Sequence, residues 1–73
     1  MGKTIYSKEH LTLVKRIRQA RIDAGFDQNK VAKLLGKTQS YISKVESGQI
    51  KIGIIQLKNI AKMYRKDLDY FID

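Results

Sequence analysis

The chain has 73 residues and no cysteine, so it has room for one domain and excludes disulfides and thiolate metal sites. Fifteen lysines and arginines against seven aspartates and glutamates give a net charge of +8, which favours a polyanionic partner. No apolar run approaches the roughly 18 residues of a membrane span, and the lack of cysteine fits a reducing compartment. We therefore expect a cytoplasmic protein with no membrane partner.

The positive charge is unevenly distributed along the chain. Residues 1–66 carry all 15 basic residues and four acidic ones, a net charge of +11, whereas residues 67–73 carry three aspartates and no base. The C-terminal end is therefore the part least suited to contact phosphate. A lysine-rich surface also serves solubility alone, so charge by itself leaves both explanations open.

Glycines and capping residues divide the chain into segments of helical periodicity. Residues 1–7 are expected to form a flexible arm. A first helix is predicted between Ser7, a suitable N-cap, and Gly25, where a residue without Cβ can end it. His10 is expected to face solvent early in this helix. The predicted inward face contains Val14, Ile17, Arg21 and Ala24.

Two short helices are predicted next. The first begins after Asp27 and ends at Gly36, and the second begins after Thr38 and ends near Gly48. The expected buried positions are Val31, Leu34 and Leu35 in the first of these helices and Ile42 and Val45 in the second.

Two further helices complete the predicted domain. One spans about residues 54–64, and Asp67 caps a last short helix. Because helices of eight or nine residues are not stable alone, their apolar faces must pack on one another. The sequence therefore predicts a compact, all-α, five-helix domain over residues 1–73. The inner positions of the last two helices are Leu57, Ile60, Ala61 and Tyr64, then Leu68, Phe71 and Ile72.

The stretch 28–47 has the spacing of a helix-turn-helix. This motif needs a small residue where its helices cross, a glycine in the turn and aliphatic anchors on the second helix. Counting Gln28 as the first position, Ala32 is fifth, Gly36 ninth, Ile42 fifteenth and Val45 eighteenth. All the requirements are met together, which makes the motif fairly specific.

The sequences GFDQNKVAKLLG at 25–36 and QSYISKVESG at 39–48 resemble the phage repressor/Cro type, or Xre family. The resemblance continues through 57–61 and 68–71. It implies a lambda-repressor-like fold whose third helix, about residues 39–47, lies in the major groove, with a homodimer on a palindromic operator. The chain departs from the family pattern at Gly53, where Ser or Thr commonly caps the fourth helix, and at Arg65, where glycine often ends it.

Base-reading candidates lie on the outward face of the predicted third helix. Glutamine can pair bidentately with adenine, lysine can donate to guanine, and serine can bond several bases. A solvated polar face is the alternative interpretation. The candidates are Gln39, Ser40, Ser43 and Lys44.

Phosphate-contact candidates lie at the ends of the two motif helices. Gln28 begins a helix whose first amides and positive dipole suit a phosphate, and its side chain can bond the same oxygen or Gln39. Tyr41 suits either a backbone contact or packing at the helix edge. The set is Gln28, Lys37, Thr38, Tyr41 and Lys51.

Arg21 and Glu46 both occupy inward-tending helical positions. An isolated buried charge costs several kcal/mol, so we expect the two to form a structural ion pair, as the resemblance also implies. Two independent surface charges are the alternative.

The segment before the fourth helix contains more apolar surface than a connection over a small core needs to bury. We expect part of it to form a two-fold dimer interface together with the last helix. The interface candidates are Ile50, Ile52, Ile54, Ile55 and Tyr70.

The sequence does not indicate an enzyme. It has one histidine, His10, and no recognisable nucleophile with its base, metal-ligand cluster or phosphate-binding glycine loop, so no cofactor, metal or small-molecule ligand is expected. The favoured function is a transcriptional regulator, such as a repressor, that binds double-stranded DNA sequence-specifically. The alternative is an antitoxin or protein-interaction module of the same fold in which DNA binding is secondary.

Overall fold

The computed structural model describes residues 7–72, and within them five α-helices and no strand are found. The predicted all-α, five-helix architecture is therefore confirmed. The expected N-terminal arm lies, apart from Ser7, outside the described residues. The helices are α1 (Lys8–Asp23), α2 (Gln28–Leu35), α3 (Gln39–Glu46), α4 (Ile54–Tyr64) and α5 (Leu68–Ile72).

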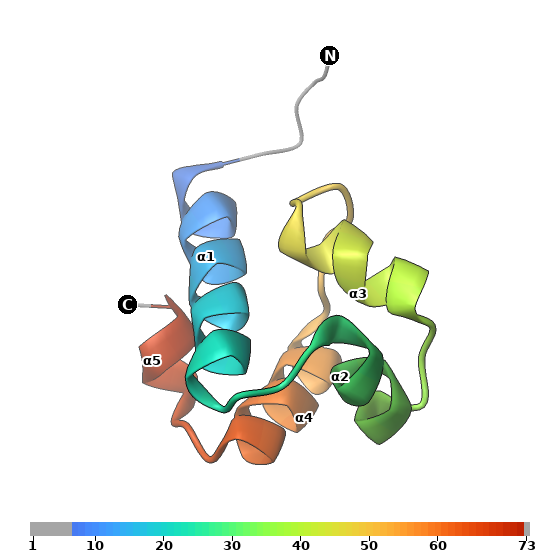
Figure 1. Cartoon of the computed structure of the whole chain (residues 1–73). Coiled ribbons are helices and arrows are strands. Elements are labelled where there is room, and N and C mark those ends of the chain that lie inside the picture. Colours follow the sequence, from blue (N-terminus) through green and yellow to red (C-terminus); the bar gives the residue numbers. More distant parts are fainter. Residues whose placement is uncertain (1–6, 73) are drawn as a thin grey trace.

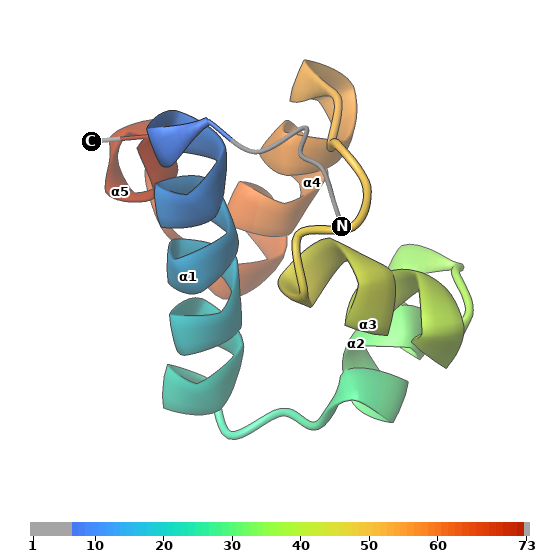
Figure 2. The same ribbon diagram turned by 90° about the horizontal axis from the view of Figure 1, so that it is seen from above.

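The helices form two flanks around α4. α1 and α5 pack together on one side, and α2 and α3 pack together on the other (Figure 1). Figure 2 shows the same order from above, with α4 between α5 and the α2–α3 pair. α3 packs on α1 and α2 only through its inner side, which leaves its outer side at an edge of the domain.

Side-chain caps fix the start of each of the first three helices. Ser7 accepts a hydrogen bond from the amide of His10 at 3.0 Å, and Asp27 accepts one from the amide of Lys30 at 2.8 Å. Thr38 accepts in the same way from the amide of Tyr41 at 3.1 Å. Each cap satisfies an amide that has no partner inside its helix, so the three predicted helix starts are confirmed.

Left-handed residues end α2 and α4. Gly36 has φ 68°, and the amide of Lys37 donates to the carbonyl of Ala32 at 2.8 Å across this turn. Arg65 has φ 57° and makes the same kind of turn at the end of α4, although it carries a Cβ. Gly53 begins α4 without a side-chain cap. Gly53 and Arg65, where the chain departs from the family pattern, are therefore weaker end signals than a Ser or Thr cap and a glycine would be. α4 nevertheless begins and ends where the sequence predicts.

All five helices contribute to one core. Phe71 of α5 is fully enclosed, and Ala32 is 3% exposed where α2 packs on α3. Burying one large aliphatic or aromatic side chain stabilises a fold by about 1.5–3 kcal/mol, which offsets the marginal stability of such short helices. The buried hydrophobic residues are Val14, Ile17, Ala20, Val31, Ala32, Ile42, Val45, Leu57, Ile60, Ala61, Tyr64 and Phe71.

Four expectations about burial were wrong. Leu34 is 53% exposed because Val31, Ala32 and Leu35 already form the inner face of the two-turn α2. Ile72 is 61% exposed because its neighbour Phe71, about 100° away around the helix, takes the core position. Ala24 is exposed because α1 ends one residue before it. His10 is half-buried, and its Nε2 lies 3.3 Å from the carbonyl oxygen of Gly48.

Candidate nucleic-acid interface

α3 presents a polar outer face. Its inner face is held in the core by Ile42 and Val45, which are 4% and 3% exposed. Because these anchors fix the rotation of the helix, the residues on the other side must face solvent. The exposed set contains all four base-reading candidates: Gln39, Ser40, Ser43 and Lys44.

The N-terminus of α3 gathers three of the phosphate-contact candidates. Thr38 caps the helix with its hydroxyl oxygen, so the hydroxyl hydrogen can still be donated outward. Lys37 is exposed and its Nζ lies 5.3 Å from the ring centroid of Tyr41. Tyr41 itself is half-buried against the core. This position is compatible with packing at the helix edge and also with a contact to the phosphate backbone. A neutral cap beside a lysine makes this helix end attractive to an anion.

The N-terminus of α2 is electrostatically different. Its cap is the carboxylate of Asp27, which already occupies the positive end of the helix dipole. The fourth candidate, Gln28, is the first residue of this helix and is half-buried. A phosphate at this position would meet a carboxylate as well as the helix amides. We therefore expect the start of α3 to bind phosphate better than the start of α2.

Gln28 joins the two helices of the motif through hydrogen bonds. The side-chain amide nitrogen of Gln39 donates to Oε1 of Gln28 at 2.7 Å. The side-chain amide nitrogen of Gln28 donates in turn to Oε1 of Glu46 at 3.1 Å. The first contact is among the alternatives that the sequence predicts, whereas the second has no sequence signal, because Gln28 and Glu46 meet only through the packing of α2 on α3.

Arg21 and Glu46 form the predicted pair. Nε of Arg21 lies 2.8 Å from Oε2 of Glu46, and Nη2 donates to Oε1 at 3.1 Å, so the contact is bidentate. The exposed fractions of the two side chains are 13% and 4%. Nη1 of Arg21 also donates to the carbonyl of Phe26 at 3.0 Å. The hydrogen bonds to Glu46 raise the pKa of Arg21 above its usual value, although burial acts in the opposite direction.

Tyr64 lies beside this pair in the core. Its hydroxyl oxygen is buried and has no hydrogen-bond partner among the described residues. Burial raises the pKa of Tyr64 to about 12, and the nearby Glu46 carboxylate acts in the same direction. The phenol is therefore neutral at physiological pH and contributes mainly through its buried ring.

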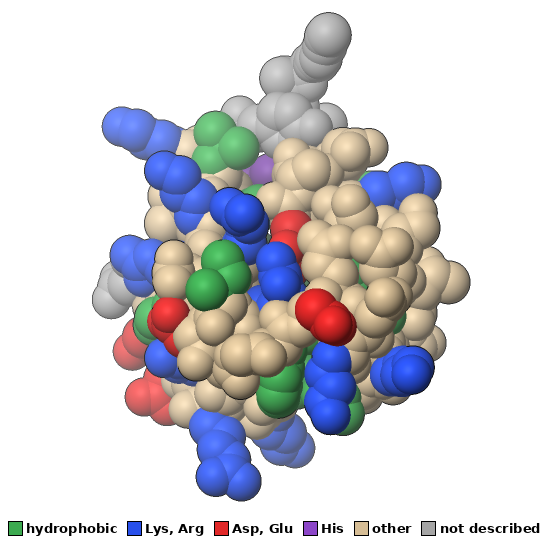
Figure 3. Space-filling model, in the orientation of Figure 1, with side chains coloured by type: hydrophobic (Ala, Val, Ile, Leu, Met, Phe, Trp, Pro, Cys, Tyr) green, Lys and Arg blue, Asp and Glu red, His purple; other side chains and the backbone are tan. Residues whose placement is uncertain are grey.

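Arg18 is a candidate that the sequence analysis did not single out. It lies at a shallow depression whose rim also includes Gln28, Ser43 and Ser47. Its guanidinium can therefore reach the phosphate backbone of a nucleic acid that lies along α3. Figure 3 shows Lys and Arg side chains gathered over α1, with fewer acidic side chains on this face. The signal available from the sequence is only the run of basic residues in 15–21, which does not indicate which of them lies beside α3.

The remaining candidates lie away from the start of α3. Lys51 is exposed in the connection between α3 and α4. Ile54 and Ile55 are 59% and 69% exposed at the start of α4. The other three interface candidates, Ile50, Ile52 and Tyr70, are half-buried against the core of the same chain.

Residues 7–72 were also compared with the requirements of a metal site and of a membrane span, and they meet neither. No three histidine, aspartate or glutamate side chains in this part of the chain are close enough together to bind a metal ion. None of its helices has the length and apolar character to cross a membrane.

The fold and the exposed face of α3 are those of a helix-turn-helix protein. The helix-turn-helix family model matches residues 17–71, which is most of the chain. The chain therefore belongs to the Xre-type helix-turn-helix family, whose members are DNA-binding transcriptional regulators. No curated protein matches the sequence.

Solved structures share the fold at low sequence identity. The restriction-modification controller protein C.AhdI from Aeromonas hydrophila has a TM-score of 0.79 and 23% identity, covering 89% of this chain and 98% of that one. Two structures of Fe(II) HppE, the second with the alternative substrate (S)-1-HPP, each have a TM-score of 0.83 and 19% identity. They cover 90% and 93% of this chain. The chain spans about a third of the length of HppE, 35% in each case, so the likeness is one of fold alone.

Proposed function

We propose that this protein is a non-enzymatic, cytoplasmic transcriptional regulator, acting as a repressor, that reads duplex DNA sequence with α3 in the major groove. The observation that carries the proposal is the solvent-facing row of Gln39, Ser40, Ser43 and Lys44, opposite anchors that fix the helix in place. An α-helix fits the major groove, where each base pair presents a distinct pattern of donors and acceptors. The resemblance in fold to a controller protein of similar length supports a regulatory role.

Different residues have different tasks in this mode of binding. Gln39 and Lys44 contact base edges and therefore carry specificity. Lys37, Thr38 and Lys51 contact phosphates at the two ends of α3 and carry affinity that is independent of sequence. Arg18 and Gln28 contact the DNA phosphate backbone beside α3.

Binding to a preferred operator and to random duplex separates these tasks. Gln39→Ala or Lys44→Ala should weaken operator binding by about 1–3 kcal/mol and change random-duplex binding little. Lys51→Ala should weaken both by a similar factor. Ile22→Ala, an exposed α1 position outside the proposed contacts, provides the control and should change neither. Equal losses on both duplexes for Gln39→Ala would rule out base reading by this residue.

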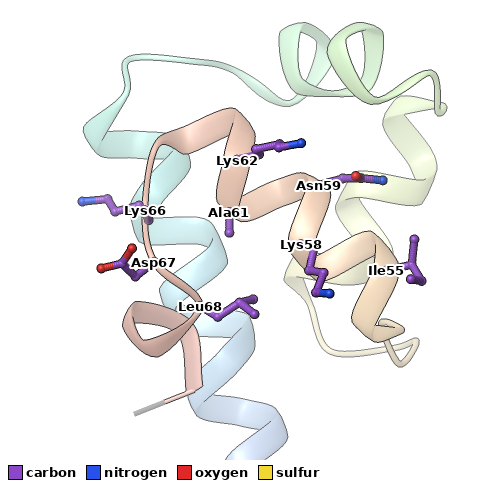
Figure 4. Close-up of a pocket in the computed structure, with 8 residues that line it drawn as sticks. All are labelled: Ile55, Lys58, Asn59, Ala61, Lys62, Lys66, Asp67 and Leu68. Atoms are coloured by element: carbon purple, nitrogen blue, oxygen red, sulfur yellow. The ribbon is translucent and has the colours of Figure 1, made fainter.

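The proposed active form is a homodimer on a palindromic operator. One recognition helix reads only a few base pairs, so a second copy about 34 Å away supplies the missing specificity. Ile54 and Ile55 are aliphatic and largely exposed, and Ile55 lines an open groove of about 420 Å³ with Lys58 and Lys62 (Figure 4). An exposed apolar patch of this kind suits a self-complementary two-fold contact. Ile50, Ile52 and Tyr70, which are half-buried against the core, complete the proposed interface.

Sedimentation equilibrium tests the dimer. Wild type should associate at tens of micromolar, and the Ile54→Asp, Ile55→Asp double variant should stay monomeric, because two carboxylates cannot be buried in an apolar contact. Ile22→Asp matches the chemistry at an exposed α1 position and should associate like wild type. A monomeric wild type, or a double variant that dimerises equally well, removes this interface.

A further inference from the structure

Four side chains from three helices form one continuous hydrogen-bonded series. It runs from Arg21 of α1 to Glu46 of α3, from Glu46 to Gln28 of α2, and from Gln28 to Gln39 at the start of α3. The inner end is a charge pair in the core, with Glu46 only 4% exposed. The outer end is an exposed residue on the face proposed to read DNA.

The carboxylate gives this series a direction. An ionised carboxylate only accepts hydrogen bonds, so Gln28 must turn its NH2 group, not its oxygen, toward Glu46. In the flipped orientation two acceptors would face each other at about the same 3.1 Å separation. The oxygen of Gln28 therefore points to Gln39, and Gln39 must turn its own NH2 group toward it.

The direction determines what Gln39 offers to a base. One hydrogen of its amide is engaged by Gln28 at 2.7 Å, which leaves the second hydrogen and the oxygen available. One donor and one acceptor match adenine, which presents N7 as acceptor and N6 as donor in the major groove. The reverse direction would engage the oxygen of Gln39 and leave only donors, which match the two acceptors of guanine.

We propose that Glu46 is a positioning residue for base reading: through Gln28 it fixes the orientation of the Gln39 amide and so selects adenine over guanine. The inference deepens the proposed function and rests on it for its consequence in DNA binding. Glu46 touches no base. It acts because its charge is held in the core by Arg21 and cannot turn away.

Glu46→Gln provides the most direct test, because it keeps the shape of the side chain but removes its restriction to accepting hydrogen bonds. A glutamine at this position both donates and accepts, so the amides of Gln28 and Gln39 can take either orientation. At the operator position where Gln39→Ala abolishes base preference, wild type should prefer adenine to guanine by about tenfold or more. Glu46→Gln should reduce this ratio to within about threefold. A preferred base other than adenine in wild type, or an unchanged ratio in Glu46→Gln, overturns the inference.

Two further variants separate positioning from stability. Leu57→Ala creates a cavity under α4, which contributes no side chain to the series or to the reading face, so it should lower stability and leave the adenine to guanine ratio unchanged. Gln28→Ala breaks the series and leaves the Arg21–Glu46 pair in place, so it should lose the ratio and carries the test if Glu46→Gln does not fold. A loss of the ratio in Leu57→Ala would reassign the effect to general destabilisation and overturn the inference.

Nuclear magnetic resonance of the free protein tests the orientation without DNA. The side-chain amide of Gln39 should show restricted motion in wild type and increased motion in Gln28→Ala and Glu46→Gln. An amide that is equally mobile in all three overturns the positioning role. If the amide is restrained in wild type and released in the variants, but no duplex is bound, the proposed function fails while the orientation of Gln39 by Glu46 stands.

Discussion

Replacing Glu46 by alanine should strongly destabilise the fold. The substitution leaves the Arg21 side chain, 13% exposed, with the carbonyl of Phe26 as its remaining hydrogen-bond partner among the described residues. Removing one member of a buried ion pair costs about 3–5 kcal/mol. A chain of this length has a total stability of about 4–11 kcal/mol at 0.05–0.15 kcal/mol per residue, so the variant should lose between about a quarter and all of it.

Urea unfolding followed by far-ultraviolet circular dichroism measures this loss as a shift in midpoint at unchanged slope. The double variant Arg21→Met, Glu46→Leu is the matched control, because it removes both charges and fills the space with apolar atoms. Its stability should lie near that of wild type or above it. A midpoint for Glu46→Ala equal to wild type would show that the two charges contribute independently, and the reasoning about the pair would be refuted.

Three other perturbations give smaller, directional effects. If a dimer contacts roughly 8 phosphates, the logarithm of the binding constant should fall against the logarithm of salt concentration with a slope near −7, and a slope shallower than about −3 would contradict a basic footprint. The unfolding free energy of wild type should fall from about pH 10 to pH 12, because Tyr64 has a pKa of about 12 when folded and 10.0 otherwise. Tyr64→Phe should lack this contribution and match wild type at pH 7, because it loses only a hydroxyl that has no partner within residues 7–72. Arg65→Gly should raise the unfolding free energy by about 0.5–1 kcal/mol, seen as a higher urea midpoint, since φ 57° disfavours a residue with Cβ; a lower midpoint would show that Arg65 makes a compensating contact.

The helices of this protein could be predicted because their boundaries are written locally. Ser7, Asp27 and Thr38 cap the next helix with their own side chains, and Gly36 supplies the left-handed turn, so each signal lies within three residues of the structure it specifies. The pair Arg21–Glu46 could also be predicted, because a charge at an inward position demands a partner.

Tertiary detail was harder to predict. Leu34 has the spacing of a core residue, but which side of a two-turn helix is covered depends on where its neighbours pack. The contact of Gln28 with Glu46 and the position of Arg18 beside α3 depend on the same packing across three helices. Periodicity within one helix contains no information about these distances.

Selection of bound duplexes from a random oligonucleotide pool tests the central claim most directly. Wild type should enrich an inverted repeat whose half-sites are about 10 base pairs apart, the spacing of two recognition helices on one face of the duplex. Gln39→Ala, selected in parallel, should lose the preference at one position of each half-site and keep the rest. No enrichment by wild type over the starting pool, or an identical repeat with Gln39→Ala, would contradict sequence reading by α3.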